Sequence, residues 1–382
     1  MPPHRRWACY LRRRRIGIAV IGAALCSVAS TLPVTAALAD EPPPTRSITV
    51  VFTGDVIAHV SVNNRAHVNA GRLTYDYRPM FADVQPILEA ADLAVCNLEG
   101  PIAPAGSRYT GAPRFASPAP LVQSLKDVGF DRCSTATNHS NDKGPAGVDA
   151  TLAAFEAAGL GASGSGRSHD EAAAQVLEVN GVRVAHLAYT FGFNGQRKFF
   201  LRSPMWINVL RADQVIADAI DARARGAEVV LVSIHWGQEF RRSITGSQRR
   251  ISEAITASGQ VDLVVGHHAH VLQPIKQVNG FWVIYGLGNF LSNQRKSTVG
   301  HAATQDGALA RVTFTEGVGG RFVAAQPEII PTYVLPGSFE ILDVRKHLAD
   351  PLLPEKTLSG LGRSWKRTTS LLGDFVPDLP TP

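Results

Sequence analysis

The sequence predicts an α/β protein in which helices cover a layered and largely buried sheet. Short runs of continuous apolar residues indicate strands that are buried on both faces, since a strand with one exposed face would alternate with polar residues. These runs occupy residues 47–52, 93–96, 130–136, 176–179, 182–188, 229–234, 263–265 and 281–285. Longer amphipathic stretches between them predict covering helices.

The helices are expected over residues 81–90, 118–128, 147–158, 211–225 and 247–258. A glycine directly follows four of them, which is typical of a helix C-terminus. Two turns, Asn180-Gly181 and Asn279-Gly280, predict hairpins that join 176–179 to 182–188 and 274–278 to 281–285. The hairpins indicate a mixed sheet rather than a purely parallel one.

The net charge of this chain comes from its first residues. The 382 residues are 45% hydrophobic and 18% charged, enough for one large α/β domain or two ordinary ones. The formal charge is +6, but six arginines and no acidic residue occur in residues 1–39. The remainder has 32 basic and 32 acidic side chains, so net charge gives no support for a nucleic-acid partner.

The arginines precede an apolar stretch at 16–32, which is followed by Ala37-Leu38-Ala39. This is the pattern of an export signal cleaved after residue 39, by the Sec or the twin-arginine route. An uncleaved membrane anchor is the alternative, although the apolar run is short for a span. We therefore expect a periplasmic or extracellular protein, with a membrane-anchored one as the alternative. Its parts would be a linker at 40–46, one domain at 47–340 and a peripheral tail at 341–382.

Two cysteines remain after the signal, Cys96 and Cys133, and each lies inside a predicted strand. Their spacing is not that of a zinc site. Two buried thiols are the expected state, with a disulfide between neighbouring strands as the alternative in an oxidising compartment.

Six short polar segments each follow a predicted strand. They are Gly54-Asp55-Val-Ile-Ala-His59, Asn97-Leu98-Glu99, Asn138-His139-Ser-Asn-Asp142, His235-Trp236-Gly237, Gly266-His267-His268-Ala-His270 and Gly288-Asn289-Phe290. Loops at strand ends present side chains from a rigid sheet, so these groups are expected to converge at one edge. Carboxylate, amide and imidazole donors together suit divalent metals, which predicts a metal site of the hydrolase type.

Single members of this set are weak signals. Asp55 or Glu99 alone is more often a turn residue, and His235 alone is more often a satisfied core histidine. The three histidines of the fifth segment are harder to explain structurally, because imidazoles packed so closely either share a metal or repel one another when protonated. Asn138 can offer an amide oxygen to a metal while His139 faces a reacting oxygen.

The ordered set resembles the CapA family of capsule synthesis, which is associated with poly-γ-glutamate and related to calcineurin-like metallophosphoesterases. The resemblance covers about residues 47–300. It rests on Gly-Asp…His, Asn-Leu-Glu-x-Pro, Thr-Asn-His-Ser-x-Asp-x-Gly, His-Trp-Gly-x-Glu, Gly-His-His-x-His-Val-Leu-Gln-Pro and Tyr-x-Leu-Gly-Asn-Phe. It implies a four-layer αββα sandwich with mixed sheets and a centre for two divalent ions, Mn, Fe or Zn, at the strand ends.

The resemblance also implies roles for individual residues. The metal ligands would be Asp55, His59, Glu99, Asn138, His235, His267, His268 and His270, with Glu99 between the two ions. His139 would be the catalytic acid that protonates a leaving oxygen or stabilises developing charge. Substrate contacts would come from Asn97, Asp142, Trp236, Glu239 and Asn289.

Two departures from the superfamily pattern concern the metals. Gly-Asp-x-x-x-His replaces the usual Asp-x-His opening, and Glu99 takes the position of a bridging Asp. Either change could reduce the number of metals to one or alter the preferred substrate.

These observations favour an exported, CapA-like, metal-dependent hydrolase of capsule or poly-γ-glutamate biosynthesis. Its substrate would be a phosphoester or an amide of an acidic polymer. The alternative is a non-catalytic, membrane-associated component that holds an anionic polymer for the synthesis or export machinery. A structural single-metal fold without a ligand is a third reading.

Overall fold

The computed structural model describes residues 45–194 and 206–378. The expected signal at 1–39 and the linker up to residue 44 lie outside the described residues. Within the described residues, no helix is both long and apolar enough to serve as a membrane span.

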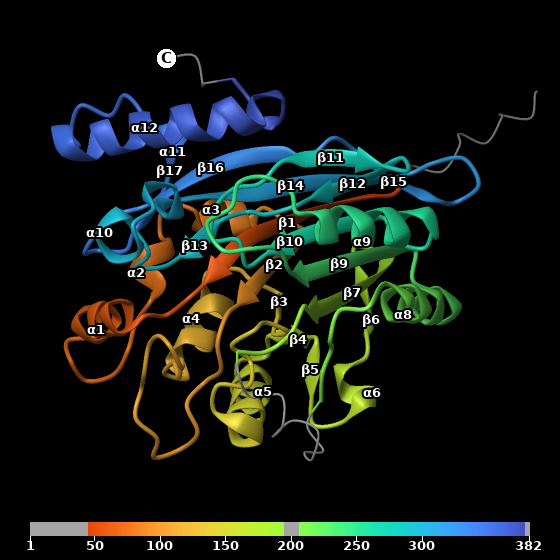
Figure 1. Cartoon of the computed structure of the whole chain (residues 1–382), viewed down its shortest axis with the longest axis horizontal. Coiled ribbons are helices and arrows are strands. Elements are labelled where there is room, and N and C mark those ends of the chain that lie inside the picture. Colours follow the sequence, from red (N-terminus) through yellow and green to blue (C-terminus); the bar gives the residue numbers. More distant parts are fainter. Residues whose placement is uncertain (1–44, 195–205, 379–382) are drawn as a thin grey trace, which may run out of the picture. The chain divides into compact units, whose positions relative to one another are not determined.

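Among the described residues, nine strands form one mixed sheet (Figure 1). The order is β17-β16-β14-β1-β2-β3-β4, with β13 beside β1 and β15 beside β14. The bounds are β1 (Ser47–Val56), β2 (Leu93–Leu98), β3 (Arg132–Ser134), β4 (Gly161–Ser163), β13 (Asn289–Leu291), β14 (Asp306–Glu316), β15 (Phe322–Ala324), β16 (Glu328–Val334) and β17 (Ile341–Asp343). β1 to β4 run parallel, whereas β14 pairs with β1 in the antiparallel direction.

A second mixed sheet of six described strands has the order β11-β12-β10-β9-β7-β6. Its bounds are β6 (Val176–Val179), β7 (Val182–Thr190), β9 (Val229–His235), β10 (Leu263–His267), β11 (Ile275–Val278) and β12 (Phe281–Ile284). Both expected hairpins are confirmed, β6–β7 and β11–β12. Asn180 and Asn279 have φ of 45° and 50°, and the glycine after each is also left-handed, as a two-residue turn of this type requires. A separate pair joins β5 (Ser165–Gly166) to β8 (Trp206–Ile207).

The helices of the described residues lie outside and at the edges of the two sheets. They are α1 (Val60–Asn69), α2 (Arg78–Phe81), α3 (Gln85–Glu89), α4 (Pro120–Asp127), α5 (Gly144–Ala158), α6 (His169–Ala172), α8 (Ala212–Ala224), α9 (Gly246–Ala257), α10 (Lys296–Val299), α11 (Val344–His347) and α12 (Glu355–Leu372), with 3-10 turns at Ala302–Gln305 and Gly373–Phe375. The single helix expected over 81–90 is wrong. The chain breaks after α2 and restarts at α3, with Pro86 in the first turn, where a missing N–H costs nothing.

Three buried apolar clusters lie between four layers of secondary structure, which are helices, sheet, sheet and helices. One cluster joins the two sheets and contains both Val50 of β1 and Leu231 of β9. Val51, the next residue of β1, faces the other way into a cluster with the helices α2 to α5. The third cluster packs the six-stranded sheet against α8 and α9. Figure 1 shows α8 and α9 alongside this sheet. The αββα sandwich with mixed sheets is therefore confirmed.

The segment after residue 340 begins with the edge strand β17 and continues into α11 and α12. β17 pairs with β16, and Leu361 and Leu372 of α12 are buried. The segment is therefore packed at the edge of the sandwich. The domain boundary at residue 340 stays a prediction.

Cys96 of β2 and Cys133 of β3 lie directly opposite each other in the register of these parallel strands. Their sulfur atoms form a disulfide. The expectation of two free thiols is wrong, and the cross-strand alternative holds. The sequence placed both cysteines on strands, but only the register of the sheet makes them opposite neighbours.

Candidate metal centre

The ends of five strands bring the expected donors together. Asp55 in β1 pairs with Asn97 in β2 on one side and with Asn289 in β13 on the other. In the second sheet, His267 at the end of β10 lies opposite His235 at the end of β9. All of these side chains are buried. Polar side chains from both sheets therefore face one another at the same end of the sandwich.

Glu99 directly follows β2 and lies between histidines of the second sheet. Its Oε1 is 3.6 Å from Nε2 of His235 and 3.7 Å from Nε2 of His270. Burial alone would raise the pKa of Glu99, but positive charge on His270 and His235 outweighs it and lowers the pKa to about 2. Glu99 is therefore a carboxylate at neutral pH.

Asp55 is held by hydrogen bonds to both of its oxygens. Oδ1 accepts from the side-chain amide of Asn97 at 2.9 Å, and Oδ2 accepts from the backbone N–H of His268 at 3.2 Å. Nδ1 of His270 is 3.1 Å from Oδ2. Burial would raise the pKa of Asp55, but His267 and His270 hold it well below its usual value. This carboxylate is also charged and fixed in direction.

The donor atoms form three overlapping groups, in each of which they lie within 4.8 Å of one another. The groups are Glu99 with His235 and His268, Asp55 with Glu99 and His270, and Glu239 with His268 and His270. Every pair of groups shares a residue, so the donors form one continuous cluster. Such a set of carboxylate and imidazole ligands is compatible with divalent cations.

Several buried polar atoms of this cluster have no hydrogen-bond partner among the described residues. They are Oε2 of Glu99, Oδ1 of Asn97, Nδ1 of His235, Nδ1 of His268 and both ring nitrogens of His267. Buried polar atoms are nearly always paired, and each unpaired one costs free energy. Lone pairs gathered in this way are what metal coordination satisfies, so the residues present fit a bound cation.

His139 lies beside the cluster and is oriented by two neighbours. Its Nδ1 is 2.7 Å from Oδ2 of Asp142, and the side-chain amide of Asn194 is 3.2 Å from its Nε2. The ring also packs edge-on against Phe115, with 4.7 Å between the ring centroids. Burial would lower the pKa of His139, but Asp142 and Glu99 raise it above the usual value. The ring is therefore suited to hold a proton.

A cavity of about 570 Å³, called here the metal-centre cavity, opens over these residues. Glu99, His139 and His270 line it, together with apolar side chains such as Phe115 and Phe240. Reactive groups and apolar walls thus share one space large enough for a small substrate group.

Some of the expected metal ligands contact the donor cluster, and others lie outside its three groups. Asn138 joins the cluster, since its Oδ1 is 2.8 Å from Nε2 of His235. His267 approaches Oδ1 of Asp55 at 3.4 Å but belongs to none of the three groups. His59 lines the metal-centre cavity outside those groups. Its Nδ1 lies 3.1 Å from the carbonyl oxygen of Ile57.

The five residues expected to contact substrate also differ in their surroundings. Asn97, Asp142 and Asn289 are hydrogen-bonded to Asp55, His139 and His270, respectively, and so orient those side chains.

Glu239 is exposed and lines the metal-centre cavity. Trp236 instead lies in the core, 2% exposed, with its indole N–H donating to the carbonyl oxygen of Tyr285. The ring packs in the apolar cluster against the six-stranded sheet. A substrate contact by Trp236 stays a prediction.

Two residues that contact His139 in this cavity were not among the expected site residues. Asn194 is part of a short Gly- and Asn-containing segment after β7, the kind of strand end that supplied the other groups. Phe115 comes from a loop between β2 and α4 and has no sequence signal, since only the folded loop brings it onto His139.

Proteins similar to this chain are found among bacterial capsule synthesis proteins. Residues 49–294 match the family described as "Bacterial capsule synthesis protein PGA_cap". "PGA biosynthesis protein CapA" of Bacillus subtilis is 33% identical over 249 residues, 64% of this chain and 63% of that protein. "Capsule biosynthesis protein CapA" of Bacillus anthracis is 30% identical over 271 residues, 69% of this chain and 63% of that protein. The chain thus spans less than two thirds of either relative.

Among solved structures, the calcineurin-like phosphoesterase YfkN of Bacillus subtilis aligns with 12% identity and a TM-score of 0.46. The alignment covers 86% of this chain and 99% of that chain. The match of the family model over more than half of the chain is decisive. The protein belongs to the bacterial capsule synthesis family PGA_cap.

Proposed function

We propose that this protein is an exported, metal-dependent hydrolase that acts on an anionic polymer in capsule or polyglutamate biosynthesis. The two Bacillus relatives are named as proteins of PGA biosynthesis and of capsule biosynthesis, which supports a role in making such a polymer. The hydrolytic activity rests on the site itself. Its substrate bond would be a phosphoester or an amide of the polymer.

The observation that carries the proposal is the position of His139. A metal that only stabilised the fold would need ligands and no acid beside them. Here a buried histidine, oriented through Nδ1 by Asp142, lines the same cavity as Glu99 and His270. An oriented acid next to a cluster of donors is the arrangement that hydrolysis requires.

The donor cluster would hold two divalent ions, of Mn, Fe or Zn. Asp55 and His270 would hold one ion, and Glu99 would lie between the two. Asn138, His235 and His268 would hold the other. When bound, such ions activate water near neutral pH and neutralise charge on the reacting group.

The protein's own side chains supply the remaining steps. Asp142 fixes the His139 ring, so that Nε2 is directed toward the cavity side near Asn194. From Nε2 the ring delivers a proton to the leaving oxygen or nitrogen as the substrate bond breaks. Phe115 and Phe240 line the same cavity, and their apolar side chains would reduce the access of other water molecules.

The test uses the purified protein, prepared without chelator and analysed for bound metal. Bis-p-nitrophenyl phosphate and poly-γ-glutamate are offered with and without Mn²⁺. We expect metal-dependent turnover of at least one of them, which His139→Ala abolishes while the metal content is kept. His169→Ala, at an exposed histidine, is the matched control. Metal-bound protein that turns over neither compound would contradict the proposal.

Export is supported by two independent features. Residues 1–39 have the composition of an export signal, and the Cys96–Cys133 disulfide suits an oxidising compartment. Cell fractionation followed by N-terminal sequencing tests it. A mature chain beginning at residue 40 in the periplasm or medium is expected, and a cytoplasmic protein with residues 1–39 intact would refute it.

A second candidate is a non-catalytic, membrane-associated component of polymer assembly or export. One observation favours it: a Mycobacterium tuberculosis protein named "Probable polyglutamine synthesis accessory protein" is 24% identical over 274 residues. The two candidates differ in cells. If His139→Ala supports polymer formation as well as the unchanged protein does, the accessory role is favoured over hydrolysis.

A further inference from the structure

A second cavity, of about 380 Å³, lies next to the metal-centre cavity. The two share a wall formed by the start of α1 and the loop before α4. His59 and Pro113 line the metal-centre cavity, whereas Val60 and Tyr109 line the second one. Gly111 closes this wall, since a Cβ there would lie 3.2 Å from the backbone nitrogen of Val60. The two cavities therefore lie on the two sides of one short stretch of chain.

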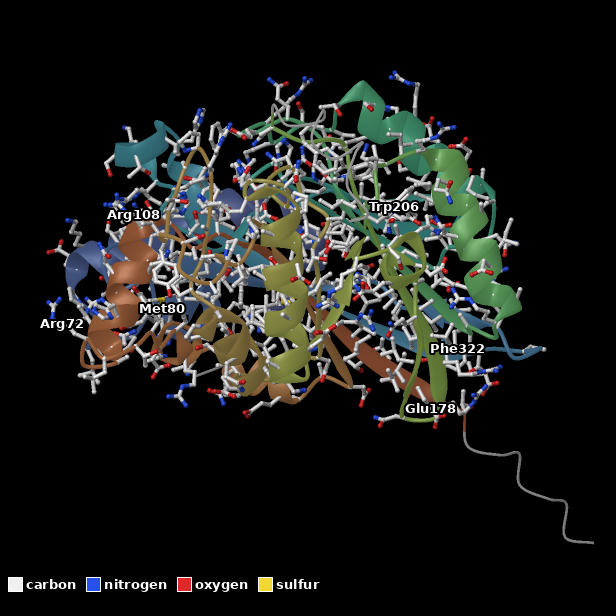
Figure 2. All side chains as sticks on the ribbon, turned by 90° about the horizontal axis from the view of Figure 1, so that it is seen from below. Arg72, Met80, Arg108, Glu178, Trp206 and Phe322 are labelled. Carbon is white, nitrogen blue, oxygen red and sulfur yellow. A yellow bond between two sulfur atoms is a disulfide. The ribbon has the colours of Figure 1, made fainter. Side chains whose placement is uncertain are left out.

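The second cavity carries a positive charge. Arg108 is exposed in its lining and forms no ion pair among the described residues. Figure 2 shows Arg108 on the side of the molecule where α1 lies. The cavity lining contains no acidic side chain among the described residues. The nearby carboxylate of Asp76, next to Tyr75, is paired with Arg78 at 2.8 Å.

The other groups of this cavity suit a chain of alternating polar and methylene groups. Tyr75 and Tyr109 meet edge to face, with 5.2 Å between the ring centroids, and offer apolar faces with polar ends. Asn64 and Ser107 add an exposed amide and an exposed hydroxyl. These groups can hydrogen-bond to a polymer backbone while the rings pack on its methylenes.

The metal-centre cavity is lined by carboxylates and histidines instead of a guanidinium. Glu99 and Glu239 line it, and no lysine or arginine does so among the described residues. A polyanion would therefore meet fixed protein cations outside the reacting centre, at Arg108. An exposed guanidinium binds carboxylates through two parallel hydrogen bonds.

We infer that the second cavity is a substrate subsite that binds a carboxylate of an extended polycarboxylate chain through Arg108, while another part of the chain occupies the metal-centre cavity. The inference rests on the proposed function and narrows its substrate to a linear polymer. Affinity should therefore depend on chain length. A ligand that fills only the metal-centre cavity does not reach Arg108 and gains no affinity from it.

The experiment measures binding by calorimetry to γ-linked glutamate oligomers of two and of ten residues, with metal-loaded full-length protein. The longer oligomer should bind at least tenfold more tightly. Arg108→Gln should remove about tenfold of this difference and leave the affinity for the dimer unchanged. Arg250→Gln, which removes the same charge from α9 on the other sheet, is the matched control and should change neither value.

Equal affinity for the two oligomers, or equal losses in Arg108→Gln and Arg250→Gln, would overturn the inference. A ten-residue polyphosphate that binds equally well and depends equally on Arg108 would overturn the assignment to polycarboxylates. Turnover of bis-p-nitrophenyl phosphate and of poly-γ-glutamate separates the two proposals. If neither compound is turned over while Arg108-dependent binding persists, the hydrolase proposal fails alone. If either is turned over and binding does not depend on chain length, the subsite fails alone.

Discussion

The Nδ1 atom of His139 lies 2.7 Å from Oδ2 of Asp142, and the same oxygen accepts the backbone N–H of Phe115 at 2.7 Å. One carboxylate oxygen therefore joins the histidine to the wall of the metal-centre cavity. All three residues are buried. The ring cannot turn without breaking this contact, so its outer nitrogen keeps one direction.

Asp142→Asn should lower kcat by at least about tenfold, with KM and bound metal unchanged, because a neutral amide no longer holds His139 in its charged, oriented form. Steady-state kinetics on bis-p-nitrophenyl phosphate and metal analysis measure this. Loss of metal in proportion to the loss of activity would show instead that Asp142 supports the cluster.

Glu99→Gln should remove bound metal, because this substitution takes one negative charge from two of the three donor groups. Added Mn²⁺ raises the Tm of the unchanged protein by binding the folded state, and this rise should disappear in the variant. His59→Ala is the control, since His59 lines the cavity outside those groups. Normal metal content in Glu99→Gln, or its loss in His59→Ala alone, would contradict the assignment.

Replacing both Cys96 and Cys133 by serine should lower the free energy of unfolding by about 3 kcal/mol, because the crosslink restricts the unfolded chain. Urea unfolding of the variant and of the unchanged protein, without reductant, measures the difference. Thiol titration of the denatured, unreduced protein is the control. Two titratable thiols per chain would show that the bond is not formed.

Asp83 connects the turn after α2 to α11. Its Oδ1 lies 2.9 Å from Nε2 of His347 and contacts Nζ of Lys346. Its Oδ2 accepts the backbone N–H of Asp343 at 2.8 Å. Burial would raise the pKa of Asp83, but these partners lower it below its usual value. A carboxyl with a lowered folded pKa stabilises the protein above its unfolded pKa of about 3.9, and the benefit is lost as the pH falls through the folded pKa.

Asp83→Asn should therefore lower the Tm at pH 7, corresponding to about 1–2 kcal/mol, and the gap to the unchanged protein should shrink below about pH 4. Thermal unfolding of both proteins across this pH range tests it. A constant gap at every pH would mean that the shape of the side chain, and not its charge, stabilises α11.

Local patterns in the sequence were enough for many of the elements and for the kinds of site residue, although not for the break between α2 and α3 or for α12. Continuous apolar runs identified β9 and β10, and the Asn-Gly pairs identified both hairpins, because burial and left-handed turns are properties of a few neighbouring residues. The histidines and carboxylates at strand ends were identified for the same reason. The position of a histidine or carboxylate at the end of a strand does not depend on which strand is its neighbour in the sheet.

The partners of those residues were decided only by the tertiary structure. The register of β2 against β3 set Cys96 opposite Cys133. The packing of α1 against the loop before α4 places Phe115 against His139. It also places Arg108 in the lining of the second cavity. Trp236, next to His235 in sequence, turned into the core instead. Hydropathy and spacing report whether a residue is buried, whereas contacts between distant segments depend on how the whole sandwich packs.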